Sequence, residues 1–129
     1  MPNITITNFD RSGVVIKDPV FDNRTLTSTG AATWPAGAVL GKITASGKLA
    51  RFATGASDGS EVPYAVLTQP VEFSGAGDRT ERPLISGEVR QGKLVDAADA
   101  AITPAAVDQL RDVGIIALPV TELLAQDNQ

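Results

Sequence analysis

The residue types that most often carry acid–base or nucleophilic chemistry are missing from this sequence. Its 129 residues include no histidine and no cysteine. Their absence excludes imidazole general bases, cysteine nucleophiles, disulfide bonds and thiolate zinc sites. A catalytic or metal site would therefore depend on carboxylates, hydroxyl groups and backbone atoms.

Two short segments could bind an ion. Asp58, Ser60 and Glu61 could offer oxygens to calcium, but the spacing of an EF-hand is absent and Asp58-Gly59 is a common turn pair. Residues 74–77 are rich in glycine, yet neither a helix pattern nor a Lys-Ser or Lys-Thr pair follows, as a phosphate-binding loop requires. Turns are the better interpretation of both segments.

One pair of acids could in principle serve a hydrolase. Glycosidases need two carboxylates at a defined separation, and Glu72 and Glu88 lie on neighbouring predicted strands. The sequence does not fix their separation, neither residue lies in a recognisable catalytic context, and solvated strand charges are the better interpretation. The prediction is therefore that the protein is not an enzyme and has no cofactor and no metal site.

Composition narrows the possible partners. The net charge is −4 and the sequence pI is about 4.7, which argues against nucleic acid because phosphate binding needs a basic face. No apolar run approaches the ~20 residues of a membrane span, and no secretory leader opens the chain. We therefore expect a single domain with no nucleic-acid and no membrane partner.

The clearest predicted element is a helix over about residues 103–113. Thr103 is a good N-cap, Pro104 suits the first helical position, and Gly114 suits the position after the end. Its apolar residues form one stripe, and an apolar run at 115–118 predicts a last strand.

The rest of the chain reads as short strands separated by turns. The pattern predicts a hairpin over 38–44 and 48–52, further strands, and exposed loops. The strands cover residues 62–67, 71–73, 83–89 and 93–95, and the loops cover 54–61 and 74–82. The predicted fold class is α+β: a small, mostly antiparallel β-rich domain with one principal helix and an extended N-terminal arm.

The predicted arm covers residues 1–31 and the compact domain residues 32–129. Residues 3–7 alternate apolar and polar side chains, but the arm lacks a helix and an adequate apolar face. Such a segment can add a strand to the open edge of another protein's sheet, or it can pair within its own domain. The candidate partner-binding residues are Ile4, Ile6, Phe9, Val14 and Ile16.

Trp34 and Pro35 lie at the junction between the predicted arm and domain. Trp34 is the only tryptophan. A large aromatic side chain at this position either covers the edge of the core or anchors an interface. Both alternatives remain open, and Trp34 and Pro35 are candidates for a subunit interface.

From Thr33 onward the chain resembles the head decoration proteins of lambda-type bacteriophages. The resemblance is collinear over about residues 30–120, and the order of the motifs is more specific than any one of them. It rests on TWPAGAVLGKIT at 33–44, SGKL at 46–49, SDGS at 57–60, YAVL at 64–67, SGEV at 86–89, the helix at 103–113 and GII at 114–116. The arm is the least matched part.

The resemblance implies a structural capsid decoration, or cement, protein that forms homotrimers. These would bind the major capsid protein on the outer surface of the expanded phage head and stabilise it against internal DNA pressure. It also implies synthesis in the cytoplasm of the bacterial host and an N-terminal arm that pairs with the shell. The alternative is a virion surface or tail module that recognises a host receptor or glycan, although the predicted loops lack tryptophan and tyrosine.

Overall fold

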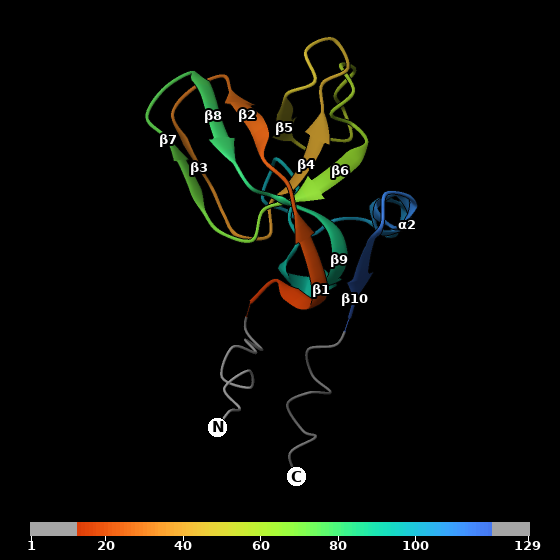
Figure 1. Ribbon diagram of the computed structural model, residues 1–129. Coiled ribbons are helices and arrows are strands. Elements are labelled where there is room, and N and C mark those ends of the chain that lie inside the picture. Colours follow the sequence, from red (N-terminus) through yellow and green to blue (C-terminus); the bar gives the residue numbers. More distant parts are fainter. Residues whose placement is uncertain (1–12, 120–129) are drawn as a thin grey trace, which may run out of the picture.

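The computed structural model describes residues 13–119 (Figure 1). This part of the chain contains ten strands, one short 3-10 helix and one α-helix. The elements are β1 (Val15–Phe21), β2 (Arg24–Ser28), β3 (Ala32–Trp34), β4 (Val39–Lys42), β5 (Leu49–Arg51), β6 (Pro63–Val66), β7 (Val71–Phe73), β8 (Gly77–Glu81), β9 (Leu84–Arg90), η1 (Gln91–Lys93), α2 (Pro104–Asp112) and β10 (Ile115–Leu118).

Eight strands form one curled sheet, in the order β1-β9-β6-β4-β5-β2-β8, with β10 also paired to β9. β3 and β7 form a second, two-stranded sheet. Most neighbours are antiparallel, whereas β10 runs parallel to β9 and β2 parallel to β5. The described chain is therefore strand-rich and mostly antiparallel with a single α-helix, as predicted.

The helix forms where its caps predict it. The Thr103 hydroxyl accepts a hydrogen bond from the Ala106 amide at 3.2 Å, Pro104 is the first helical residue, and Gly114 has a φ of +93°. Ala106 and Leu110 are buried, and α2 packs against β10 and β6 (Figure 1). The hydrophobic stripe thus covers one end of the sheet.

The predicted hairpin is also confirmed, because β4 and β5 pair antiparallel around Gly47, whose φ is +76°. Two other predictions were wrong. Residues 93–95 do not form a regular strand, since 91–93 are a 3-10 turn. Residues 77–81 are not a loop but β8, which carries mostly exposed polar side chains and so lacks the alternation that marks a half-buried strand.

The expectation that residues 1–31 lack a core does not hold for residues 13–31. β1 pairs with β9, β2 pairs with β8 and β5, and Leu26 is fully buried. The partners of both strands lie more than 20 residues away in the chain, so local sequence does not reveal them. Pairing within the domain, the second of the two alternatives, applies to this part.

The core consists of two groups of buried side chains. One joins α2 to the β9 end of the large sheet and includes Phe52, Leu84, Leu110 and Ile115. The other lies beneath β3 and β7 and includes Leu26.

β2 pairs with β8 and β3 pairs with β7, and the register is the same in both pairs although unpaired residues connect them. Ser28 faces Gly77 and Ala32 faces Phe73, so the connecting residues 29–31 and 74–76 have equal lengths. We call residues 24–34 and 71–81 the long ribbon; it arches over the left side of the molecule in Figure 1.

Candidate functional site

The structure separates the residues that the sequence grouped as a binding arm. Ile4, Ile6 and Phe9 lie outside the described residues. Ile16 is half-buried on β1. Val14 is only 5% exposed and belongs to the core group around α2, so in this chain it is a core residue rather than a surface contact. Its carbonyl oxygen accepts a hydrogen bond from the Arg90 amide at 2.8 Å, which turns the side chain inward beside β9.

Trp34 is 4% exposed and packs against Phe73, with ring centroids 4.6 Å apart and ring planes at 46°. It covers the core group beneath β3 and β7, which is one of the two alternatives that its position allowed. Pro35 is half-buried and its carbonyl oxygen accepts from the Ala38 amide. Within the described chain, therefore, Pro35 offers more surface to a neighbour than Trp34 does.

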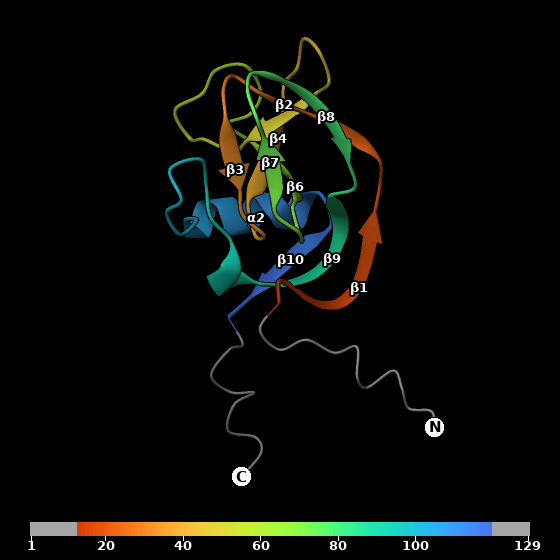
Figure 2. The same ribbon diagram turned by 90° about the vertical axis from the view of Figure 1, so that its left-hand side faces the viewer.

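The described chain starts and ends on either side of one strand. Val89 of β9 pairs with Val15 of β1 on one side and with Ala117 of β10 on the other. Strands lie about 4.8 Å apart, so Val15 and Ala117 are about 10 Å apart. Figures 1 and 2 show β1 and β10 flanking β9 at the same end of the molecule.

Arg90 lies between these two ends. Its side chain is fully buried, and Nη1 donates to the carbonyl oxygens of Gly13 at 2.6 Å and Val15 at 3.3 Å. On the β10 side, Arg90 pairs in register with Leu118. The sequence did not identify this residue, because an arginine at the end of an apolar strand reads as an ordinary exposed strand terminus.

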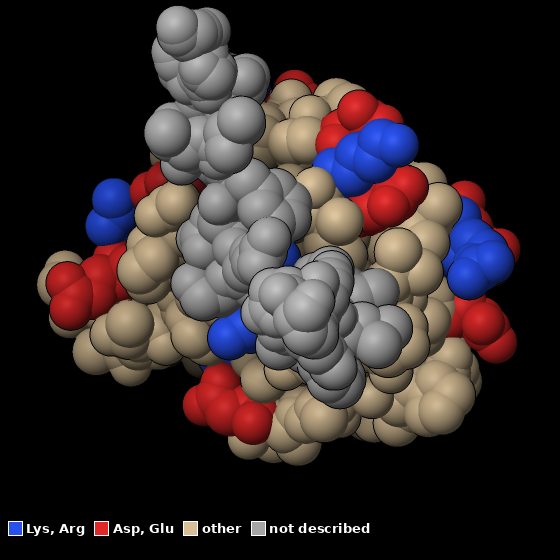
Figure 3. All heavy atoms as spheres, turned by 90° about the horizontal axis from the view of Figure 1, so that it is seen from below, with Lys and Arg blue, Asp and Glu red and all other residues tan. Residues whose placement is uncertain are grey.

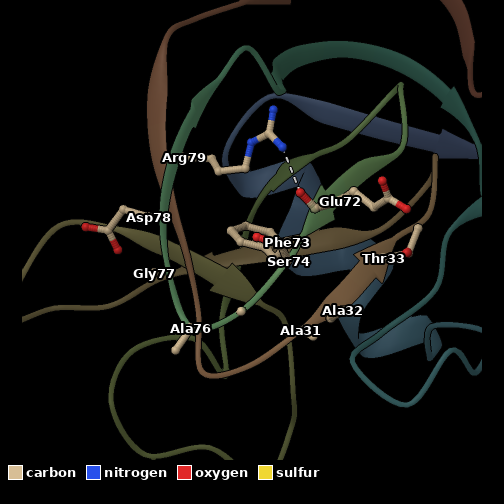
Figure 4. Close-up of a pocket in the computed structure, with 11 residues that line it drawn as sticks. Ala31, Ala32, Thr33, Glu72, Phe73, Ser74, Ala76, Gly77, Asp78 and Arg79 are labelled. Atoms are coloured by element: carbon tan, nitrogen blue, oxygen red, sulfur yellow. Dashed lines mark hydrogen bonds between the residues drawn. The ribbon is translucent and has the colours of Figure 1, made fainter.

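A shallow hollow of about 760 Å³ opens where the long ribbon is interrupted (Figure 4). Small residues of the connecting segments line it, together with Phe73 and with Glu72 and Arg79 at its rim. Arg79 donates to the Glu72 carbonyl oxygen at 2.7 Å and pairs with Glu81 at 3.0 Å. The Arg79 guanidinium is therefore bound to partners within the long ribbon.

Charged side chains on the surface pair with one another. Lys48 lies 2.6 Å from Asp78, and this hydrogen bond, with a second from Thr27, lowers the pKa of the Asp78 carboxyl. Figure 3 views the side at which β1 begins and β10 ends; around the margin formed by described residues, acidic and basic side chains lie side by side. This margin therefore carries mixed charge.

Two of the carboxylates singled out for chemistry have a structural role. Hydrogen bonds from the Ser60 hydroxyl and amide lower the pKa of Asp58, and Glu61 accepts from the Gly59 amide. These bonds close a turn. Glu72 and Glu88 lie on β7 and β9, which belong to different sheets. Over residues 13–119, no group of three or more acidic residues is arranged to hold a metal ion.

No helix among the described residues is long and apolar enough to cross a membrane.

Among curated proteins, none matches the chain significantly. A model of the family described as bacteriophage lambda head decoration protein D matches residues 4–115. The match covers most of the chain and includes β1 to α2. The family is a structural one, and its members are found on the phage capsid. The chain belongs to the bacteriophage lambda head decoration protein D family.

Proposed function

We propose that the chain forms homotrimers that bind the outer surface of expanded phage heads. There they would hold neighbouring major capsid subunits together against the pressure of the packaged DNA. The observation that supports this best is the convergence of β1 and β10 on Val89. Residues 1–12 and 120–129 both join the folded domain at this end, so both can reach the same surface.

Several weak contacts on one face give an efficient attachment. In a trimer, three copies of each terminal segment would face one shell, and each binding event after the first becomes intramolecular. A protein that binds only the expanded shell also stabilises that state by mass action, without an energy source.

Residues 3–7 are the proposed strand that pairs with the capsid protein, because polar and apolar residues alternate there. Ile4, Ile6 and Phe9 would supply the apolar contacts, with Ile16 at their base on β1. Val14 is excluded because it is buried in the core. For the boundary between subunits, the half-buried Pro35 is a better candidate than the buried Trp34.

Co-sedimentation with undecorated, expanded heads tests this proposal. The informative truncation removes residues 1–12, because removing 1–31 would also delete the buried Val14 and Leu26 and so confuse unfolding with lost binding. A chain without residues 120–129 tests the contribution of the C-terminal segment separately. Sedimentation equilibrium of each chain gives the number of subunits.

We expect the full chain to be trimeric, to bind expanded heads and to raise the temperature at which filled heads release DNA. The chain without residues 1–12 should stay trimeric and lose binding. Equal binding by both would move attachment to the folded domain. If the full chain does not bind an expanded head of its own phage, the decoration proposal fails. Binding to host cells or glycans would then favour the receptor-binding alternative.

A further inference from the structure

We propose that Arg90 is a positioning residue for shell attachment, because its guanidinium fixes residues 13–15, to which the N-terminal segment is joined. This inference rests on the proposed function, which assigns attachment to the residues before Gly13. It concerns residues 13–15 and β9, all of which the structure describes.

Arg90 holds three consecutive carbonyl groups. Its Nη1 donates to Gly13 and Val15, and its backbone amide donates to Val14. The guanidinium is fully buried, where hydrogen bonds to charged groups are stronger than in water and costly to lose. The side chain and the backbone amide of Arg90 therefore fix the start of β1 to the end of β9.

The rest of β1 is held by irregular pairing with β9. Its register against β9 shifts between each successive pair of partners, and Asp18 has a φ of +52°. Irregular pairing of this kind provides few well-aligned ladder bonds. Without the Arg90 side chain, residues 13–15 would lose both guanidinium hydrogen bonds and keep only the backbone pairing with β9 and the buried Val14 side chain.

Arginine suits this position better than lysine. Its planar guanidinium presents several N–H donors in a fixed geometry, so it can bind two carbonyl oxygens of one strand at once. A lysine ammonium could reach one of them, but it is more strongly hydrated and less rigidly held. A methionine would fill similar space without either hydrogen bond.

A fixed starting point should strengthen attachment. If residues 13–17 come loose, five more residues lie between the folded domain and the proposed contact at residues 3–9, which lowers the effective concentration of that contact at the shell and adds the cost of ordering residues 13–17 to binding. Lengthening the connection from about 12 to about 17 residues lowers the effective concentration roughly twofold for each loosened segment, and the ordering cost adds to this loss.

The test compares Arg90→Lys and Arg90→Met with the matched control Arg51→Met. The Arg51 side chain is 13% exposed, and it donates to the Asp96 carbonyl oxygen and to the Asp99 carboxylate at 2.8 Å. It is thus a largely buried arginine that also binds a carbonyl, but it holds a loop rather than β1. Two measurements are needed: hydrogen exchange of residues 13–21 by mass spectrometry, and the affinity for undecorated expanded heads.

We expect Arg90→Met to speed exchange in residues 13–21 and to weaken binding about tenfold or more, since several segments bind together. Arg90→Lys should be intermediate in both, and Arg51→Met should change neither. Should Arg90→Met fail to fold, Arg90→Lys carries the same comparison, because it retains the cation and the aliphatic stem.

Three results would overturn the inference. The first is faster exchange in residues 13–21 with unchanged binding. The second is an Arg51→Met protein that binds as weakly as Arg90→Met, because any loss of stability would then explain the effect. The third is unchanged exchange in both Arg90 variants. If the unaltered chain does not bind expanded heads, the proposed function fails instead, and exchange alone still reports whether Arg90 holds β1.

Discussion

The two end strands of the large sheet are built in opposite ways. β8 pairs with β2 through five consecutive residues without a shift in register. β1 pairs with β9 through four separated pairs, and the register shifts between each of them. Both strands expose an edge in the described chain, so the sheet limits further strand pairing by two different means.

On β8 the means is charge. Asp78, Arg79 and Glu81 are placed along a regular strand and bind partners within the chain. On β1 the means is backbone shape, because Asp18 has a positive φ and Pro19 follows it. The comparison teaches that the two edges of the sheet are held differently: β8 has a regular ladder, whereas β1, which follows the N-terminal residues, depends on a few specific contacts.

The largest expected effect is at the regular end. Leu26 of β2 is fully buried, so Leu26→Ala should lower the free energy of unfolding by about 3 kcal/mol. Urea denaturation measures this. The neighbouring Thr25→Ala is the control and should change it by less than about 1 kcal/mol, since Thr25 is only half-buried. If Leu26→Ala lowers the free energy of unfolding no more than Thr25→Ala does, the backbone pairing of β2 rather than the buried Leu26 side chain holds this edge.

At the irregular end, Gly87→Ala should cost about 2 kcal/mol of unfolding free energy. Gly87 has a φ of +133°, and a Cβ there would come 2.8 Å from the Asp18 carbonyl oxygen. The control is Gly92→Ala, where no atom lies within 4 Å of an added Cβ. Thermal unfolding of Gly87→Ala and Gly92→Ala shows whether Gly87 allows β1 to bend. Similar melting temperatures for the two variants would contradict this role of Gly87.

A smaller effect of opposite sign is expected at Asp18. Glycine adopts positive φ freely, so Asp18→Gly should stabilise the protein by less than about 1 kcal/mol. Asp18→Ala should destabilise it by a similar amount, because alanine tolerates this backbone region poorly. Chemical denaturation of the two variants shows whether each change raises or lowers the free energy of unfolding. A loss in both would show that the Asp18 side chain, rather than its backbone, matters.

The smallest effect concerns the charge on β8. The Lys48 hydrogen bond lowers the pKa of Asp78 below its ordinary value of 3.8 in the folded chain. The ionised form is therefore favoured by folding, and this stabilisation is present above pH 3.8 and is lost as the pH falls through the lowered value. The stability difference between the unaltered protein and Asp78→Asn should shrink over that acidic range. Lys48→Met should remove most of the same pH dependence, and a difference that persists at low pH would contradict the assignment.

Much of the fold could be predicted from the sequence, for identifiable reasons. The helix was predictable because Thr103, Pro104 and Gly114 act locally, and the β4–β5 hairpin because its turn lies between its strands. β8 was missed because its exposed charges hide the strand period. Residues 13–31 were misjudged because their partners come from β8 and β9, far along the chain.

The candidate site was less predictable. Val14 looked like a surface residue of an arm, and its burial depends on α2 and β9, which the local pattern cannot show. Trp34 could be placed at a junction, but only the position of Phe73 decided between core and interface within the chain. Arg90 was missed because its acceptors are backbone carbonyls, which every residue possesses.

The unbroken register of the long ribbon constrains how this gene can vary in length. Deleting one codon within 29–31 would shift β3 against β7 by one residue and turn Trp34 from the core to the opposite face. Only a matching deletion within 74–76 would restore the pairing. Insertions and deletions at these two places should therefore occur together, although 42 residues of other structure separate them in the sequence.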